Sequence, residues 1–148
     1  MAVQVRQNIS TVPLFRGGTT FIIDDAVIAY SSAADLENGT VMAKKSADGK
    51  WVAFTNEAAT DGTALPAGVY LGPTIAAADL DGSDITGQTI LVGGTCTLDA
   101  EQVKLHNSKT LATAIGGTAA FNAQVRDVLA WRGLFIESTV DIDEYENS

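Results

Sequence analysis

Residues 39–55 read GTVMAKKSADGKWVAFT and carry the clearest strand signal in the chain. Two runs rich in β-forming residues, 40–44 and 51–55, stand on either side of Asp48-Gly49. An Asp-Gly pair between two such runs is the strongest local signal for a β-hairpin, because a type I′ turn requires positive φ at both central residues. The stretch therefore predicts two antiparallel strands joined by a two-residue turn.

Short strand patterns extend from this hairpin in both directions along the chain. Upstream, residues 19–23 and 27–30 are strand candidates, with Asp24-Asp25 as the turn between them. Downstream, strands are expected at residues 68–72, 88–99 and 134–143, with loops at 56–67 and 77–87. Gly93-Gly94 interrupts the strand at 88–99 and predicts a β-bulge or a sharp bend there.

One α-helix is expected, near residues 118–132. Thr118 is its candidate N-cap, and Gly133 follows the last turn as a C-terminal stop. The apolar residues between them recur at i, i+4, i+7 and i+8, which places them on one face of a helix. They are Phe121, Val125, Val128 and Leu129.

These elements predict a mainly β fold, a small β-barrel or sandwich-like domain with one late α-helix and an extended N-terminal arm. A chain of 148 residues fits one domain with short arms. We expect the arm at residues 1–18, the β-rich domain at 19–143, and an acidic C-terminal tail at 144–148. One helix is too few for the crossovers of a parallel βαβ sheet.

The expected arm is apolar, rich in β-branched residues and free of acidic side chains. Pro13 argues against a long central strand, and Gly17-Gly18 predicts a flexible joint. An arm of this kind could add a strand to the sheet of a partner. The same residues are also compatible with an ordinary first strand of the domain. In the arm interpretation, the candidate contact residues are Val3, Val5, Arg6, Ile9, Val12, Leu14, Phe15 and Arg16.

The overall charge and hydropathy exclude several classes of protein. The formal net charge is −9, and such a surface repels nucleic-acid phosphates. No run approaches the ~20 apolar residues that span a bilayer, and no secretory leader is recognisable at the N-terminus. We therefore expect no nucleic-acid or membrane partner, and synthesis in a cytoplasm.

We predict that the protein is not an enzyme and that it has no cofactor, because no catalytic or metal-ligating constellation is recognisable. A single histidine, His106, and a single cysteine, Cys96, are too few for a zinc site. Residues 79–84 are rich in aspartate but lack the spacing of an EF-hand, so they are interpreted as a turn. Gly116-Gly117 has no adjacent cation with which to hold an anion.

Three other side chains are interpreted as structural. Cys96 lies between threonines on a strand and is expected to be a small buried hydrophobic residue rather than a reactive thiol. Trp51 and Trp131 are the two largest side chains, and core packing is favoured over an interface role for both.

The segment from Leu36 to Ala76 resembles the head decoration proteins of lambda-like phages. A Gly-Thr/Val strand, a short turn, a second strand, a small-residue loop with Asp-Gly and a Gly-aliphatic strand follow one another in that family. Here these parts read NGTVMA (38–43), SADGK (46–50), WVAF (51–54), TDG (60–62) and GVYL (68–71). The resemblance covers about a third of the chain, and residues 85–148 have no clear counterpart.

The resemblance implies a virion protein that decorates the outer capsid surface. Such a protein is a homotrimer at three-fold and quasi-three-fold positions, and its partner is the major capsid protein. The resemblance also implies an N-terminal arm that becomes ordered on the capsid and adds a strand there. Deleting residues 1–16 is then expected to weaken capsid binding and to leave the fold intact.

Two other functions remain open at this point. One is a phage tail or virion-surface module that binds a receptor or a glycan, which would present exposed aromatic side chains on one loop face. The other is an enzyme with a trimeric β-fold, which would need an acidic metal-binding cluster beside a lysine or arginine that holds phosphate.

Overall fold

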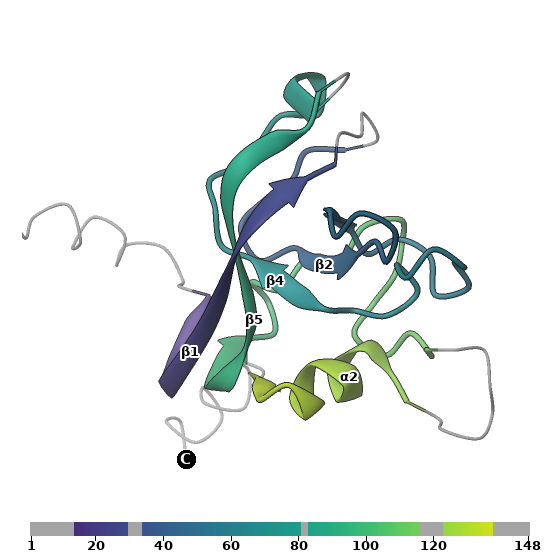
Figure 1. Ribbon diagram of the computed structural model, residues 1–148. Helices are drawn as coiled ribbons and strands as arrows, with labels where there is room; N and C mark the ends of the chain where they lie inside the picture. The colour runs from purple at the N-terminus through teal and green to yellow at the C-terminus, as the bar shows by residue number, and fades with distance from the viewer. Residues whose placement is uncertain (1–13, 30–33, 81–82, 116–122, 138–148) are drawn as a thin grey trace, which may run out of the picture.

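The computed structural model describes residues 14–29, 34–80, 83–115 and 123–137 (Figure 1). The fold is mainly β, as the sequence predicts, with 44% of the described residues in strands or bridges and 10% in helices. The elements are β1 (Phe15–Ile28), β2 (Val41–Lys44), β3 (Trp51–Ala53), β4 (Gly68–Tyr70), the 3-10 helix η2 (Ala77–Leu80), β5 (Ile85–Asp99), α2 (Val125–Trp131) and β6 (Leu134–Glu137).

The six strands form one sheet in the order β1-β3-β2-β4-β5-β6, and β1 also pairs with β5. This second pairing closes the first five strands into a barrel-like ring. The ring is not a full barrel, because β1 and β3 pair only where Ile28 faces Trp51. Figure 1 shows β1 and β5 running side by side as a long twisted ribbon, with β2 and β4 branching from its middle.

The hairpin of β2 and β3 is confirmed, but its turn is longer than expected. The Lys45 N–H donates to the Lys50 carbonyl oxygen at 2.8 Å, which closes a loop of four residues rather than two. Gly49 has a φ of 72°, whereas Asp48 does not enter the positive region. The Asp48 carboxylate instead accepts a hydrogen bond from the Lys50 N–H at 3.0 Å, and this contact stabilises the four-residue loop.

β1 is one strand of 14 residues, so the two strands and the Asp24-Asp25 turn expected in this region are wrong. Asp24 and Asp25 face Ile90 and Thr89 within the antiparallel ladder with β5. A continuous partner strand holds the two aspartates extended, despite their preference for turns. β5 itself begins at Ile85, inside the expected 77–87 loop, which also contains η2.

The bulge expected at Gly93-Gly94 is confirmed. The β1–β5 register slips there, because Ile22 faces Gly93 while the next residue, Ile23, faces Leu91. Gly94 has a φ of 128° and packs against the Thr20 carbonyl group, so a Cβ at this position would collide with that oxygen.

Helix α2 is shorter than the expected 118–132. Gln124 is extended, with φ −110° and ψ 168°, and forms an isolated bridge with Ala114. The Gln124 N–H donates to the Asp127 carboxylate at 2.9 Å, which caps the first turn and starts the helix at Val125. Val128 and Leu129 are buried as the apolar stripe predicts, whereas Thr118 and Phe121 lie outside the described residues.

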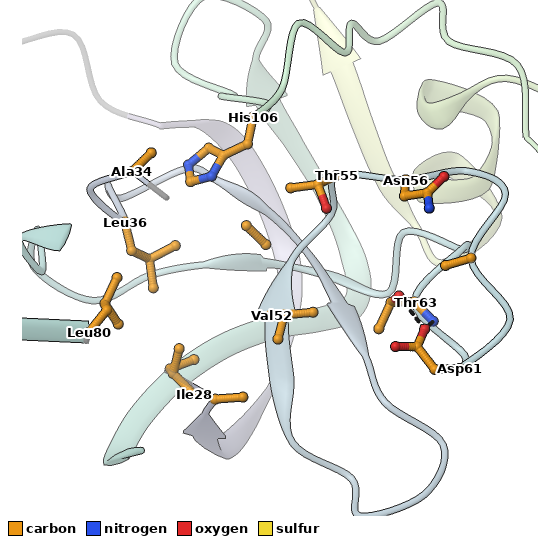
Figure 2. A pocket seen from close by; sticks show the side chains of 13 residues that line it. Ile28, Ala34, Leu36, Val52, Thr55, Asn56, Asp61, Thr63, Leu80 and His106 are labelled. Atoms are coloured by element: carbon orange, nitrogen blue, oxygen red, sulfur yellow. Dashed lines mark hydrogen bonds between the residues drawn. The ribbon is translucent and has the colours of Figure 1, made fainter. Parts of the chain in front are cut away.

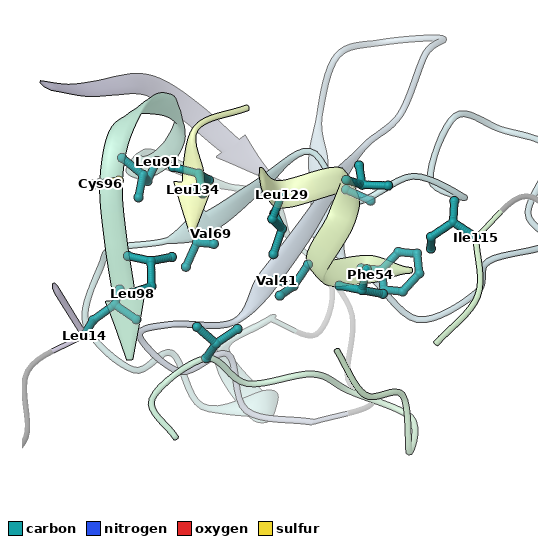
Figure 3. Packing of buried hydrophobic residues seen from close by; sticks show 14 of the residues in the cluster. Leu14, Val41, Phe54, Val69, Leu91, Cys96, Leu98, Ile115, Leu129 and Leu134 are labelled. Atoms are coloured by element: carbon teal, nitrogen blue, oxygen red, sulfur yellow. The ribbon is translucent and has the colours of Figure 1, made fainter. Parts of the chain in front are cut away.

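The hydrophobic core has two parts, one on each side of the ring. Leu129 of α2 packs onto Val41, Val69 and Leu91 on the outer side (Figure 3), and Trp51 lies with Tyr70 and other residues on the inner side. Trp51 is therefore a core residue, as expected.

Trp131 is not a core residue, contrary to expectation, because 70% of its surface is exposed. It follows Leu129 by two residues, which is about 200° around a helix, so it points away from the sheet that Leu129 contacts.

Candidate functional site

The end of the expected arm is anchored in the domain rather than free of it. Leu14 belongs to the outer core, and its carbonyl oxygen accepts the Asp99 N–H at 2.8 Å. The next residue, Phe15, faces Leu98 at the start of the β1–β5 ladder. Leu14, Phe15 and Arg16, together with their partner Asp99, are called the arm root below.

An ion pair with a buried member holds the arm root together. Arg16 Nη1 lies 3.7 Å from Asp99 Oδ2, and the Asp99 side chain is 1% exposed. The other carboxylate oxygen accepts the Glu101 N–H at 2.9 Å. Oδ2 has no hydrogen-bond donor within the described residues, so the guanidinium of Arg16 is the group that offsets its burial.

The domain therefore includes Leu14, so the arm ends before this residue and not at residue 18. Leu14, Phe15 and Arg16, three of the expected contact residues, are part of the domain. Gly17 and Gly18 lie within β1, so this pair is not the flexible joint that the sequence suggests. The remaining contact residues, Val3, Val5, Arg6, Ile9 and Val12, lie outside the described residues, and the partner that they contact stays a prediction.

A second surface surrounds the Gly93-Gly94 bulge. Every residue of β1 from Gly17 to Ile23 is exposed, and none of the seven is charged. Phe21, Ile22 and Ile23 are about half exposed. Two further exposed side chains, Leu65 and Trp131, come from the loop before β4 and from the end of α2. Phe21, Ile22 and Ile23, the run of β1 that lies opposite the bulge, are called the bulge patch.

The bulge glycine Gly93 lies close to Ile22 and to the residue that follows α2. A Cβ built on Gly93 would lie 3.8 Å from Ile22 Cδ1 and 3.3 Å from the Arg132 carbonyl oxygen. That carbonyl accepts the Gly94 N–H at 3.1 Å, so the residue after Trp131 is tied directly to the bulge. Leu65 and Arg132 both line a shallow pocket of about 350 Å³ whose floor includes Val92 of β5.

Another pocket, of about 420 Å³, contains the single histidine (Figure 2). Its lining is mainly small and apolar, with His106, Asn56 and Asp61 among the polar members. Thr63 donates hydrogen bonds to the Asp61 carboxylate from its hydroxyl and from its N–H, and they hold the pKa of Asp61 below its usual value. Both hydrogen bonds go to Oδ1 of Asp61, and within the described residues no hydrogen bond or ion pair joins Asp61 to His106.

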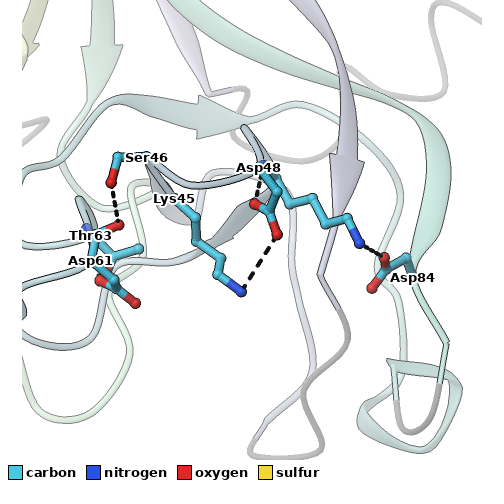
Figure 4. Close-up of polar contacts among 7 residues, drawn as sticks. Lys45, Ser46, Asp48, Asp61, Thr63 and Asp84 are labelled. Carbon is cyan, nitrogen blue, oxygen red and sulfur yellow. Dashed lines mark hydrogen bonds and ion pairs between the residues drawn. The ribbon is translucent and has the colours of Figure 1, made fainter.

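One aspartate of the 79–84 segment, Asp84, forms an ion pair, whereas residues 81–82 lie outside the described residues. The Asp84 carboxylate pairs with the Lys50 ammonium group (Figure 4), and this contact raises the pKa of Lys50. An ammonium group on the carboxylate opposes cation binding there. Among the described residues, no three His, Cys, Asp or Glu side chains lie close enough to hold a metal ion.

Cys96 behaves as the small hydrophobic residue that the sequence predicts. It is buried within the outer core, and burial raises the pKa of its thiol. A raised pKa lowers the fraction of thiolate at neutral pH, which makes the side chain a poor nucleophile.

The bulge patch was not predicted, although one signal in the sequence could have found it. Phe21, Ile22 and Ile23 are consecutive large apolar residues in a strand. Since alternate residues point to opposite faces, such a run must place apolar side chains on both faces of a two-stranded ribbon. No pattern in the sequence around Asp99 predicts that this residue is buried, because its burial depends on β1, β5 and the loop at 101–103 together.

No protein-family model matches the chain, and a search of curated proteins likewise finds no match. Within the described ranges, no helix is both long and apolar enough to cross a membrane.

Proposed function

We propose that this chain is a non-enzymatic virion protein that decorates and stabilises the outer surface of a phage capsid. The observation that carries the proposal is the arm root. An acid-free, β-prone segment directly precedes Leu14, and Leu14 and Arg16 are held by the core and by Asp99. Force applied to the arm by a bound partner would therefore be transmitted to the sheet.

The resemblance to lambda-like head decoration proteins supplies the identity of the partner. The segment that carries the resemblance contains β2, β3 and β4, which lie next to one another in the sheet. The order of strands and turns read from residues 36–76 is thus compatible with the resemblance, and the major capsid protein is the proposed partner.

The mechanism that we propose is strand addition by the arm. Residues 3–12 would pair with an exposed strand edge of the capsid protein, and backbone hydrogen bonds would supply most of the affinity. A trimer presents three such arms, so the first contact raises the effective concentration of the other two. This avidity offsets the conformational entropy lost when each arm is fixed.

A receptor- or glycan-binding module is less well supported. That function called for exposed aromatic side chains gathered on one loop face. The large aromatic residues exposed among the described residues are Phe21, Trp131 and Phe135, and they lie on β1, α2 and β6 instead.

The test is co-sedimentation with expanded capsids of the phage that encodes the chain. The whole chain should bind them, and a variant that lacks residues 1–12 should bind at least tenfold more weakly while unfolding at the same temperature. A full-length Val5→Pro/Ile9→Pro variant, which cannot donate the same backbone hydrogen bonds, should behave like the deletion. A variant that lacks residues 144–148 is the control and should bind like the whole chain.

Two results would reject parts of this proposal. If the 1–12 deletion binds capsids as tightly as the whole chain, the arm is not the contact. If the whole chain does not bind capsids at all, the decoration function is wrong.

A further inference from the structure

The pocket that contains His106 combines aliphatic walls with a single carboxylate. Among the described residues that line it, Asp61 is the one acidic side chain, and none is a lysine or an arginine. A cavity with apolar walls and few polar groups is the usual form of a binding site. Figure 2 shows Asp61 at one side of the pocket and several of the aliphatic side chains at the other. The large aliphatic residues of the lining are Ile28, Leu36, Val52 and Leu80.

Two contacts hold the polar wall of this pocket in place. The Asn107 side-chain amide donates to the Thr55 carbonyl oxygen at 3.2 Å, and Lys109 Nζ lies 2.6 Å from Glu57 Oε2. The loop after β3 is thereby tied to the turn that follows His106. The ion pair also neutralises Glu57, which leaves Asp61 as the charged group of the wall. The pocket is therefore already formed before a ligand enters, which lowers the cost of binding.

The Asp61 carboxylate is oriented for a ligand. The hydroxyl and the N–H of Thr63 both donate to Oδ1 of Asp61, so Oδ2 is the oxygen that can still accept. These hydrogen bonds hold the pKa of Asp61 below its usual value, and Lys45 adds to this effect. The ammonium group of Lys45 is itself 3.9 Å from the Asp48 carboxylate (Figure 4). Asp61 is thus a fixed negative charge beside an apolar surface.

A lysine side chain matches this combination of groups. Its methylene stem packs along apolar surface while its ammonium group pairs with a carboxylate. Arginine binds best through two parallel hydrogen bonds to both oxygens of a carboxylate, but Oδ1 of Asp61 is already engaged by Thr63. The volume of about 420 Å³ is near the lower end of the roughly 300–1,000 Å³ range of ligand pockets, which fits one long side chain better than a cofactor.

Charge and affinity indicate that this lysine belongs to a partner protein. The net charge of −9 attracts a basic surface and repels an acidic one. A single ion pair that is partly open to solvent contributes little affinity, so a free amine would bind only weakly. A side chain carried by a larger partner avoids this limit, because other contacts of the same partner bring it to the pocket.

We propose that the pocket receives a lysine side chain of the partner protein, with the stem against Val52 and Ala53 and the ammonium group at Oδ2 of Asp61. This inference rests on the proposed function for the identity of the partner, which is the major capsid protein. It adds a second contact, made by the domain itself, to the backbone pairing of the arm. Because the contact depends on charge, added salt should weaken it.

The first test is an amide NMR titration of the whole chain without capsids. The probe is Nα-acetyl-L-lysine amide, and Nα-acetyl-L-norleucine amide is the matched ligand with the same four-carbon stem and no ammonium group. The lysine amide should shift the amide signals of Ala53 and Asp61 with a Kd on the order of 1–10 mM, and the norleucine amide should bind at least fivefold more weakly.

Asp61→Asn removes the charge and keeps the Oδ1 acceptor for Thr63. The variant should unfold at the same temperature as the whole chain and should bind the lysine amide no better than the norleucine amide. Asp25→Asn is the control, because it removes the same charge from an exposed residue of β1 that does not line the pocket. It should bind the lysine amide like the whole chain.

The second test is co-sedimentation of the same variants with expanded capsids. Asp61→Asn should weaken binding at least threefold, whereas Asp25→Asn should not change it. The inference is overturned if the lysine and norleucine amides bind equally, or if Asp61→Asn binds capsids as tightly as the whole chain. If the whole chain ignores capsids but binds the lysine amide through Asp61, the decoration function is rejected and the assignment of the pocket to a lysine side chain stands.

Discussion

Replacing Arg16 with alanine tests the arm root most sharply. The substitution leaves the Asp99 carboxylate, which is 1% exposed, without the guanidinium 3.7 Å away. Removing one member of a buried ion pair costs about 3–5 kcal/mol, because the remaining charge stays buried without compensation. Arg16 itself is 19% exposed and the contact is long, so we expect a cost below that range, about 2–3 kcal/mol.

Urea denaturation followed by tryptophan fluorescence measures this change in the free energy of unfolding. Arg16→Met keeps the packing of the side-chain stem and should still lose most of the same stability. Asp99→Asn removes the buried charge, so Arg16→Ala in that background should cost clearly less than it does alone.

The surface pair of Lys45 and Asp48 provides the reference for Arg16→Ala. Their charged atoms lie 3.9 Å apart and both side chains are at least a third exposed, so Lys45→Ala should cost about 0.5 kcal/mol or less. If Arg16→Ala costs no more than Lys45→Ala, the ion pair of Arg16 and Asp99 does not hold the arm root.

Three other predictions concern the fold and the electrostatics. Deleting residues 1–16 should lower the thermal unfolding temperature, whereas deleting 1–12 should not, because Leu14 is a core residue whose loss costs roughly 2–5 kcal/mol; equal unfolding temperatures would contradict this. Gly94→Ala should destabilise the protein by about 1–3 kcal/mol or more in urea denaturation, because the φ of Gly94 is 128° and a Cβ would meet the Thr20 carbonyl. Gly87→Ala is the control and should cost less, because a Cβ on Gly87 would have open space around it. Thr63→Val should raise the pKa of Asp61 towards its ordinary 3.8 in a carboxyl NMR titration, and an unchanged titration would rule out the hydrogen bonds as the cause. Because the folded-state pKa of Asp61 is lowered, its contribution to stability is present above pH 3.8 and is lost as the pH falls through the folded value.

Local signals in the sequence were sufficient for about half of the fold. The hairpin around Asp48-Gly49, strand β4 and the bulge at Gly93-Gly94 each depend on turn or glycine chemistry within a few residues. The apolar stripe of α2 likewise depends only on local spacing, and Val125, Val128 and Leu129 are buried as that spacing predicts.

The errors arise where partners distant in the chain override local preference. Asp24 and Asp25 favour a turn by themselves, but their pairing with β5 keeps β1 continuous. α2 begins at Val125 because Gln124 is capped by Asp127 and held extended by its bridge to Ala114, and the apolar spacing reveals neither contact. The loop at Asp48-Gly49 has four residues because a side-chain hydrogen bond to Lys50 stabilises that length.

The candidate site divides in the same way. The composition of residues 1–16 indicated an arm, but the point where the arm joins the domain depends on the burial of Leu14 and on the Arg16–Asp99 contact. The bulge patch is the run Phe21, Ile22 and Ile23 of β1, which lies opposite the Gly93-Gly94 bulge. The run itself is visible in the sequence, whereas its exposure and its place opposite the bulge depend on the fold.

Amide hydrogen exchange with and without expanded capsids measures whether the N-terminal arm pairs with the capsid. We predict that the amides of residues 3–12 exchange more slowly when capsids are bound, while the amides of residues 14–16 are protected in both states. If residues 3–12 exchange equally fast with and without bound capsids, the arm does not pair with the capsid and the proposed mechanism of decoration is wrong.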